Sequence, residues 1–205
     1  MLSYLNELDT QLFWWINTHY NTPLDWIMWL ASNRWVWDVL IPIVAIYLMY
    51  KQGWKRWWLM ALGVVLCFLL SDRISVMGFK DVVQRLRPCY EFEEGVRMFR
   101  TNKGGLYGFV SSHAANCMAI AMFFTLIANS LPNRTRFIKI LPYLFFGWAL
   151  LVCYSRPYLG KHYPGDCICG SILGLAVGAF VYFVYAKVIG NLERRSKSAP
   201  SPQEE

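Results

Sequence analysis

Charged residues are scarce in this chain, where they make up 16% of the 205 residues. A soluble domain typically holds about 25%. Hydrophobic residues make up 56% of the sequence, and 10 Trp and 12 Tyr add the ring types that gather at membrane–water interfaces. The composition therefore indicates one membrane domain rather than two soluble domains.

Signals for several other classes of protein are missing as well. Residues 1–7 have neither the basic start nor the small-residue cleavage site of a signal peptide. The net charge of +7 is not gathered into a basic tract or a helix-turn-helix pattern, so we expect no nucleic acid partner. The six cysteines include no Cys-x-x-Cys pair, and five lie in apolar runs, which favours small buried hydrophobes over disulfides or metal ligands. No carboxylate cluster suits a metal, and we expect no cofactor.

Five apolar segments are candidates for membrane-spanning helices, which need about 20 residues each. They cover residues 34–50, 57–74, 113–131, 137–154 and 167–189. Residues 2–16 and 23–31 are shorter apolar pieces with a polar break between them, typical of Trp-rich interfacial helices. A half-inserted hairpin is the alternative for this part. The predicted fold is an all-α transmembrane bundle of about five to six membrane helices.

The predicted organisation has three parts. Residues 1–33 form the interfacial N-terminal helices, residues 34–190 form the membrane domain, and the polar residues 191–205 form a disordered cytoplasmic tail. Basic residues fill the first and third connections and follow the last span, which places all three in the cytoplasm. These residues are Lys51, Lys55, Arg56, Arg134, Arg136, Lys139, Lys187, Arg194, Arg195 and Lys197. Loops 75–112 and 155–166 then face outward, together with the N-terminus.

The first of three polar clusters lies in the longer outward loop. Lys80 and Arg87 are seven residues apart, nearly two helical turns, so both leave one face of a helix running over 57–86. We expect Pro88 to end that helix. A lysine and an arginine just outside the membrane can bind phosphate oxygens through hydrogen bonds of about 1.5–3 kcal/mol each. A snorkelling basic helix end is an equally good interpretation of this pair alone.

The second cluster, Ser111-Ser112-His113, opens the third apolar segment. Serines at a helix start act as caps, and the free backbone N–H groups there bind anions. Taken alone, a plain N-cap with a chance histidine is the better interpretation.

The third cluster joins the fourth and fifth segments. Ser155-Arg156 ends the fourth, while His162 and Asp166 flank the start of the fifth, where Pro164 suits a first helical turn. Asp166 follows His162 by four residues, so its carboxylate can hold one ring nitrogen and leave the other free to attack, as in a serine triad. A structural His–Asp pair at a helix cap is the alternative. Ionisable groups beside a bilayer are functional by default, so the three clusters together indicate a phosphate site.

The order and spacing of these clusters resemble the type 2 phosphatidic acid phosphatase superfamily. The patterns are Lys80-x6-Arg87-Pro88, Ser111-Ser112-His113 and Ser155-Arg156-x5-His162-x3-Asp166. The superfamily also holds bacterial prenyl-diphosphate phosphatases and vanadium haloperoxidases, and the resemblance covers residues 57–189. The second motif departs from the usual Pro-Ser-Gly-His, because Val110 replaces the proline and Ser112 brings a hydroxyl to the glycine position.

The resemblance implies a role for each motif residue. His162 is similar to the family's nucleophile, Asp166 to the carboxylate that orients it, and His113 to the general acid that protonates the departing oxygen. The residues similar to the family's phosphate cradle are Lys80, Arg87, Ser111, Ser112 and Arg156. Positioning and electrostatics dominate phosphoryl transfer, and three cations can replace Mg²⁺, so we expect metal-independent catalysis.

The resemblance implies a lipid phosphatase of a bacterial inner membrane, with its site facing the periplasm or outer side. We expect it to convert a polyprenyl diphosphate such as undecaprenyl diphosphate to the monophosphate, by family analogy. Phosphatidylglycerol phosphate, phosphatidic acid and the phosphates of lipid A are alternatives. A lipid carrier or flippase would need no His162–Asp166 pair, and a haloperoxidase relative would not need the membrane spans.

Further basic residues lie in the loop between the first two motifs and just before it. We expect most of them to be solvated, although some can meet a second phosphate or a headgroup. These residues are Arg73, Arg85, Arg97, Arg100 and Lys103. Residues 89–110 can form a flap over the site, with glycines near its end that allow it to bend. These glycines are Gly104, Gly105 and Gly108.

Overall fold

A computed structural model describes residues 2–53, 57–92 and 94–198. Lys55 and Arg56 of the first predicted cytoplasmic connection, and residues 199–205 of the predicted tail, lie outside the described residues. The helices are α1 (Leu2–Thr18), α2 (Thr22–Ser32), α3 (Arg34–Gln52), α4 (Trp57–Arg73), the π-helix η2 (Ile74–Lys80), α5 (Asp81–Val83), α6 (Pro88–Glu91), α7 (Ser112–Ser130), α8 (Arg136–Tyr158) and α9 (Pro164–Ser198). The prediction of an all-α bundle is confirmed.

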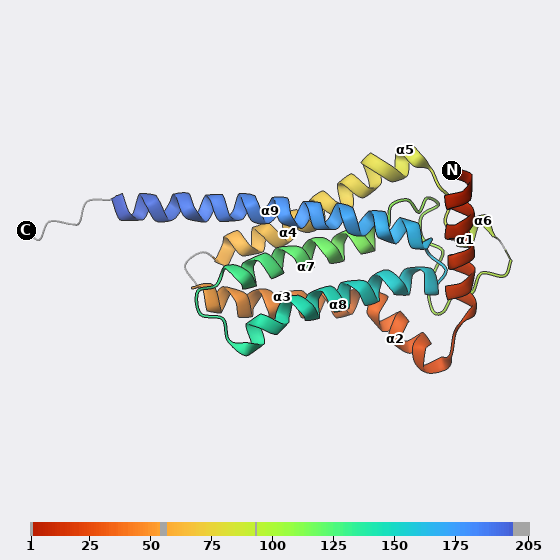
Figure 1. Cartoon of the computed structure of the whole chain (residues 1–205), viewed down its shortest axis with the longest axis horizontal. Helices are drawn as coiled ribbons and strands as arrows, with labels where there is room; N and C mark the ends of the chain where they lie inside the picture. The colour runs from red at the N-terminus through yellow and green to blue at the C-terminus, as the bar shows by residue number, and fades with distance from the viewer. Residues whose placement is uncertain (1, 54–56, 93, 199–205) are drawn as a thin grey trace, which may run out of the picture.

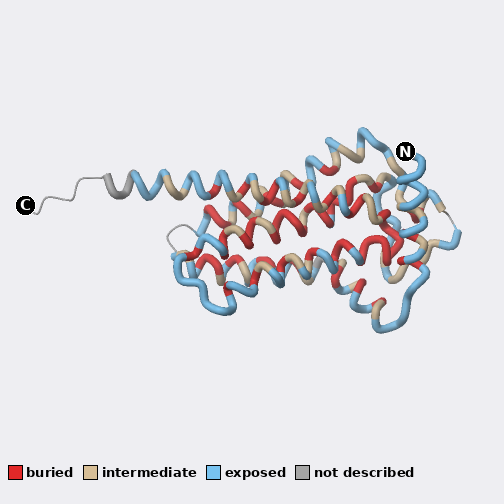
Figure 2. Tube along the Cα trace, in the orientation of Figure 1, coloured by how far each residue is buried: buried red, intermediate tan, exposed pale blue. Residues whose placement is uncertain are grey.

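Helix α7 forms the centre of the bundle, with α4, α8 and α9 packed around it (Figure 1). Of its most apolar 18-residue window, 72% is buried, against 33% for each of the other three long apolar helices. Figure 2 shows the buried residues gathered along these facing surfaces. A Cβ atom on Gly174 of α9 would lie 2.2 Å from the carbonyl oxygen of Ala115. Glycine therefore lets α9 approach α7 closely, as small residues do between membrane helices.

Four helices of the described part are long and apolar enough to cross a membrane. They are Trp57–Val83, Ser112–Ser130, Arg136–Tyr158 and Pro164–Arg194, and they match four of the five predicted spans. The remaining predicted span, 34–50, forms helix α3, which carries Asp38, an internal Pro42 and Lys51. Helix α3 packs on the shared core through Trp37 and Leu48 but does not count among these four.

Helices α1 and α2 lie at one end of the bundle, with α1 running across that end (Figure 1). The side-chain amide of Asn17 donates to the carbonyl oxygen of Tyr158 at 2.9 Å and accepts from the backbone N–H of Arg97 at 2.9 Å. The Asp25 carboxylate of α2 accepts hydrogen bonds from both terminal nitrogens of Arg97, at 2.8 and 2.5 Å. It also accepts one from the Tyr158 hydroxyl at 2.7 Å. Buried polar groups thus fasten α1, α2 and the long loop to the end of α8.

The predicted unbroken helix over 57–86 is wrong at its C-terminal end. The helix ends at Val83, and Gln84 adopts a left-handed conformation with φ 51°. The chain then runs extended, because the Arg87 N–H donates to Leu106 O at 3.1 Å and the Gly108 N–H donates to Arg85 O at 2.8 Å. Lys80 and Arg87 therefore do not share a helical face, and Pro88 begins the short helix α6 instead of ending a long one.

The ends of the last two helices also differ from the predicted segments. Helix α8 continues to Tyr158, so Ser155 and Arg156 lie in its last turn. Helix α9 begins at Pro164, as predicted. Proline suits the first turn of a helix, because N–H groups there make no hydrogen bond within the helix. Helix α9 then continues to Ser198, so residues 191–198 of the predicted tail are helical.

Candidate active site

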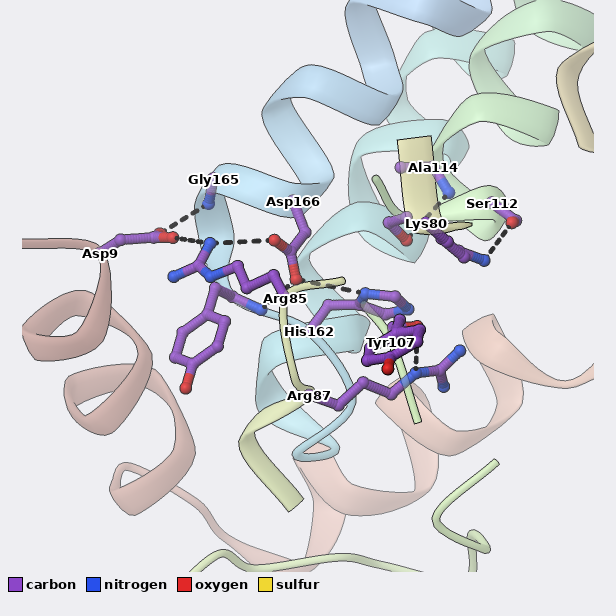
Figure 3. A network of polar contacts seen from close by, with 12 residues as sticks. Asp9, Lys80, Arg85, Arg87, Tyr107, Ser112, Ala114, His162, Gly165 and Asp166 are labelled. Atoms are coloured by element: carbon purple, nitrogen blue, oxygen red, sulfur yellow. Dashed lines mark hydrogen bonds and ion pairs between the residues drawn. The ribbon is translucent and has the colours of Figure 1, made fainter. Parts of the chain in front are cut away.

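His162 and Asp166 lie together where the turn after α8 enters α9 (Figure 3). His162 Nδ1 is 3.4 Å from Asp166 Oδ2, and the two side chains are 1% and 0% exposed. Within the described residues Nδ1 makes no hydrogen bond, so the contact is close without being fully aligned. The predicted pairing of this imidazole with this carboxylate is present, and both side chains are buried.

Asp166 is held in place by groups from three parts of the chain. Its Oδ2 accepts the Tyr163 backbone N–H at 3.0 Å, and its Oδ1 accepts Arg85 Nη1 at 3.0 Å. Arg85 Nη1 also donates to Asp9 Oδ2 of α1 at 2.7 Å, and Asp9 Oδ1 accepts the Gly165 N–H at 2.6 Å (Figure 3). A chain of polar contacts therefore links the N-terminal helix to the carboxylate beside His162.

Two of these residues were not predicted as part of the site. Arg85 is one of five basic residues of which most were expected to be solvated. Its side chain is only 19% exposed, and its guanidinium carbon lies 3.8 Å from the centroid of the Tyr163 ring. Asp9 lies in the first helix, and no local pattern in the sequence connects it to the motifs. Arg97, another of these basic residues, pairs with Asp25.

The predicted cradle residues come together from four separate segments. Lys80 Nζ donates to Ser112 Oγ at 2.6 Å, and Ser112 Oγ is also 2.7 Å from Ser75 Oγ, so the unusual serine of the second motif holds the lysine. Arg87 Nε donates to Tyr107 O at 3.2 Å. Arg156 is 5% exposed and donates through Nη1 to Ser32 Oγ, while its Nε has no hydrogen-bond partner among the described groups.

Ser111 joins the second motif to the third. Its side chain caps α7 by accepting the Ala114 N–H, and its own N–H donates to Asp166 O at 3.0 Å. Ser111 is fully buried. Because its N–H is already bound to Asp166 O, Ser111 acts here as a structural link between α7 and α9. Its predicted place in the phosphate cradle remains a prediction.

The site is strongly positive around a neutral imidazole. Burial is the largest effect that holds the pKa of His162 well below its ordinary value, followed by the charges of three nearby cations and Lys161. The three cations are Arg156, Arg87 and Lys80. Burial and the two arginines also lower the pKa of Lys161 to about 8. Lys161 was not among the predicted site residues, although it precedes His162 directly.

His113 is at the same end of the bundle, close enough to His162, Arg156, Arg87 and Lys80 to interact with their charges. Its side chain is exposed and lines a cavity of about 480 Å³. Both imidazoles are therefore within reach of the charges of Arg156, Arg87 and Lys80. Over the residues that the structure covers, no group of three or more His, Cys, Asp or Glu side chains is placed to hold a metal ion.

The end of the long loop packs directly on the imidazole–carboxylate pair. A Cβ atom on Gly108 would lie 3.0 Å from Asp166 Oδ2 and 3.5 Å from His162 Nδ1. Further back, Tyr90 donates its hydroxyl to Gly104 O at 2.7 Å, and Arg100 stacks 4.8 Å from the Trp26 ring centroid. The loop is therefore part of the wall of the site, while its movement as a flap remains a prediction.

Comparison with known proteins agrees with this arrangement. The sequence model of the PAP2 superfamily matches residues 52–189. A lipid A 4'-phosphatase from Porphyromonas gingivalis is 32% identical over 186 residues, which cover 90% of this chain and 75% of the relative. A lipid A 4'-phosphatase from Bacteroides thetaiotaomicron is 29% identical over 94% of this chain and 84% of the relative. An undecaprenyl-diphosphatase from Sulfolobus acidocaldarius is 30% identical over 81% of this chain and 73% of the relative.

The fold is also similar to that of a solved membrane enzyme. The crystal structure of a transmembrane PAP2 type phosphatidylglycerolphosphate phosphatase from Bacillus subtilis aligns with a TM-score of 0.68 and 21% identity. The alignment covers 90% of this chain and 88% of that enzyme. The chain belongs to the PAP2 superfamily and is a multi-pass membrane lipid phosphatase, a metal-independent hydrolase.

Proposed function

We propose that the protein removes a phosphate group from a membrane lipid through a phosphohistidine on His162. Nε2 attacks phosphorus while Asp166 faces Nδ1, so the oriented imidazole is the nucleophile. The observation that carries this proposal is the buried His162–Asp166 pair, neutral at the ring and surrounded by cations. A neutral imidazole is the form that can attack, and the cations stabilise the charge on the equatorial oxygens.

The remaining motif residues supply the other parts of the reaction. Lys80, Arg87 and Arg156, with the Ser112 backbone N–H, hold the phosphate oxygens. His113 gives its proton to the departing oxygen as the P–O bond breaks, and then takes a proton from the water that attacks the phosphohistidine. The products are the dephosphorylated lipid and inorganic phosphate, and both imidazoles return to their starting forms.

For the substrate we infer a sugar phosphate of lipid A in preference to a polyprenyl diphosphate. Two relatives that align with at least 90% of this chain are lipid A 4'-phosphatases, while the undecaprenyl-diphosphatase aligns with 81%. The expectation of undecaprenyl diphosphate rested on family analogy and on the compact chain, and it has less support. We place the site on the outer side of a bacterial inner membrane, as the basic connections favour.

Phosphate release in detergent, with a chelator present, tests this proposal. Wild type is expected to release phosphate from lipid A, less from undecaprenyl diphosphate, and His162→Gln is expected to lose release by at least a thousandfold. His19→Gln is the matched control, because His19 is exposed, follows the end of α1 directly and bonds to the carbonyl oxygen of Trp15. Lipid labelled with radioactive phosphate should leave an acid-labile adduct on wild type only. Full release by His162→Gln would exclude this nucleophile, and binding without release would support a carrier.

A further inference from the structure

The cavity beside His113 is bounded by α3, α4, α7 and the end of α2 and holds about 480 Å³. Its polar lining includes Asp72 of α4 and Asn116 of α7. Both Asp72 and the neighbouring Arg73, which also lines the cavity, lie inside the apolar helix Trp57–Val83. Charged side chains within a membrane helix are costly and face a functional cavity or a partner. None of the three motifs accounts for this polar group.

The position of the cavity identifies the part of a substrate that can enter it. His113 lines the cavity whereas His162 does not, and Ser32, which also lines it, accepts a hydrogen bond from Arg156. The cavity therefore opens from the phosphate cradle on the side of His113. Attacking and departing atoms lie roughly in line through phosphorus, so a group that departs toward His113 occupies this cavity.

The lining suits a neutral group that carries hydroxyls. Carboxylates such as Asp72 only accept hydrogen bonds, and Asn116 accepts from Ser71 Oγ at 2.5 Å, which leaves its amide hydrogens to donate. Trp37 and Phe68 contribute flat apolar rings, against which the C–H face of a sugar can pack. Aromatic rings beside carboxylate and amide groups are a combination that fits a saccharide.

The same lining is unfavourable for the departing group of a diphosphate. That group is itself a phosphate monoester and carries negative charge. Asp72 lines the cavity and places a carboxylate where that charged group would lie. Like charges held together in a partly desolvated cavity repel each other.

We infer that the α3–α4–α7 cavity is the subsite for a sugar ring that departs from the phosphate, with Asp72 and Asn116 as the residues that select it. This inference rests on the proposed phosphatase function and concerns which lipid the enzyme prefers. The competing role for Asp72 is that of a counter-charge for Lys80, because the two charges are close enough to interact. A counter-charge would affect every substrate equally, whereas a sugar subsite affects sugar phosphates alone.

The test compares kcat/KM on lipid A, phosphatidic acid and undecaprenyl diphosphate for wild type, Asp72→Asn and Asn116→Ala. The lipid A to phosphatidic acid ratio should fall about tenfold or more in each variant, since hydrogen bonds to substrate hydroxyls are lost. The lipid A to undecaprenyl diphosphate ratio should fall further in Asp72→Asn, because a repelling charge is removed as well. Asp81→Asn, an exposed carboxylate of α5 outside the cavity, should leave both ratios unchanged.

Equal losses on all three lipids would overturn the inference and support the counter-charge. A wild-type enzyme that is inactive on every lipid would instead contradict the proposed function itself. Thermal unfolding of each variant in detergent identifies any that fail to fold. For these, Asp72→Glu is measured instead, since a longer carboxylate keeps the charge but moves the acceptor, and it should still lower the lipid A to phosphatidic acid ratio.

Discussion

Arg85 connects the N-terminal helix to the carboxylate beside His162. Its Nη1 atom lies 2.7 Å from Asp9 Oδ2 and 3.0 Å from Asp166 Oδ1. The planar guanidinium can serve two carboxylates and still stack on Tyr163, which the single ammonium of a lysine cannot do. We therefore interpret Arg85 as a positioning residue that acts on His162 through Asp166.

Replacing Arg85 by lysine is expected to lower kcat about 10- to 100-fold and to change KM little. The phosphate cradle stays complete, while Asp166 loses the partner that fixes its orientation. Steady-state kinetics on a lipid A substrate measure both constants. Arg100→Lys is the control. Arg100 lies in the same loop as Arg85 but stacks on Trp26 of α2, and no described contact joins it to Asp9 or Asp166. A raised KM with unchanged kcat would place Arg85 in substrate binding instead.

The low pKa of His162 has a consequence for stability. Burial and nearby cations hold this pKa well below about 6.5, the value expected in the unfolded chain. As pH falls below about 6.5 the unfolded chain binds a proton at this ring and the folded protein does not, so stability is lost. Between about pH 7.5 and pH 5.5 the Tm of wild type should fall more than that of His162→Gln. Equal decreases in the Tm of wild type and His162→Gln, measured in detergent, would contradict a neutral His162 imidazole.

At the scale of elements, the end of the long loop is shaped by its contact with the third motif. Gly108 fits against Asp166 and Arg87 because it has no side chain. Gly105 lies in the same loop, where an added Cβ atom would meet nothing within 4 Å. The two glycines therefore differ in a way that substitution can measure.

Gly108→Ala is expected to lower kcat/KM about tenfold, since small displacements of catalytic groups are costly. The added carbon would sit 3.0 Å from Asp166 Oδ2 and 3.2 Å from Arg87 Cγ, so one of these groups must shift. Gly105→Ala should stay within about twofold of wild type. Equal activity of the two variants would show that the loop yields to the added carbon.

The contact between α7 and α9 also depends on a glycine whose missing side chain allows close approach. Gly174→Ala would bring a carbon to 2.2 Å from Ala115 O, which forces the helices apart. We expect a loss of about 1–3 kcal/mol of stability, seen as a lower Tm in detergent. Gly147→Ala in α8 is the control, because its Cβ would meet nothing within 4 Å and alanine favours a helix. A Tm for Gly174→Ala at or above that of the control would contradict the close packing.

At the scale of the whole molecule, the catalytic groups lie at one end of the bundle and the connection between α7 and α8 at the other (Figure 1). Arg134, Arg136 and Lys139 lie in or beside that connection, which favours its placement in the cytoplasm. The catalytic end would then face outward, where the outer leaflet supplies lipid substrates.

Labelling with a membrane-impermeant maleimide tests this orientation. In intact spheroplasts, Lys103→Cys should react and Asn133→Cys should react only after the membrane is permeabilised. Both positions are exposed, while the native cysteines are buried apart from the half-buried Cys169, so wild type gives the background. The reverse pattern would turn the site toward the cytoplasm.

The sequence by itself determined the features that depend on neighbours along the chain. Long apolar runs must become helices in a bilayer, proline at 164 suits a helix start, and His162 and Asp166 are near enough in sequence to meet. Only the tertiary structure decided the rest. The break at Gln84 follows from the pairing of Leu86 with Tyr107, and the Asp9–Arg85 contact joins residues 76 positions apart. No local sequence pattern predicts such contacts, because they depend on the packing of segments that are far apart in the sequence.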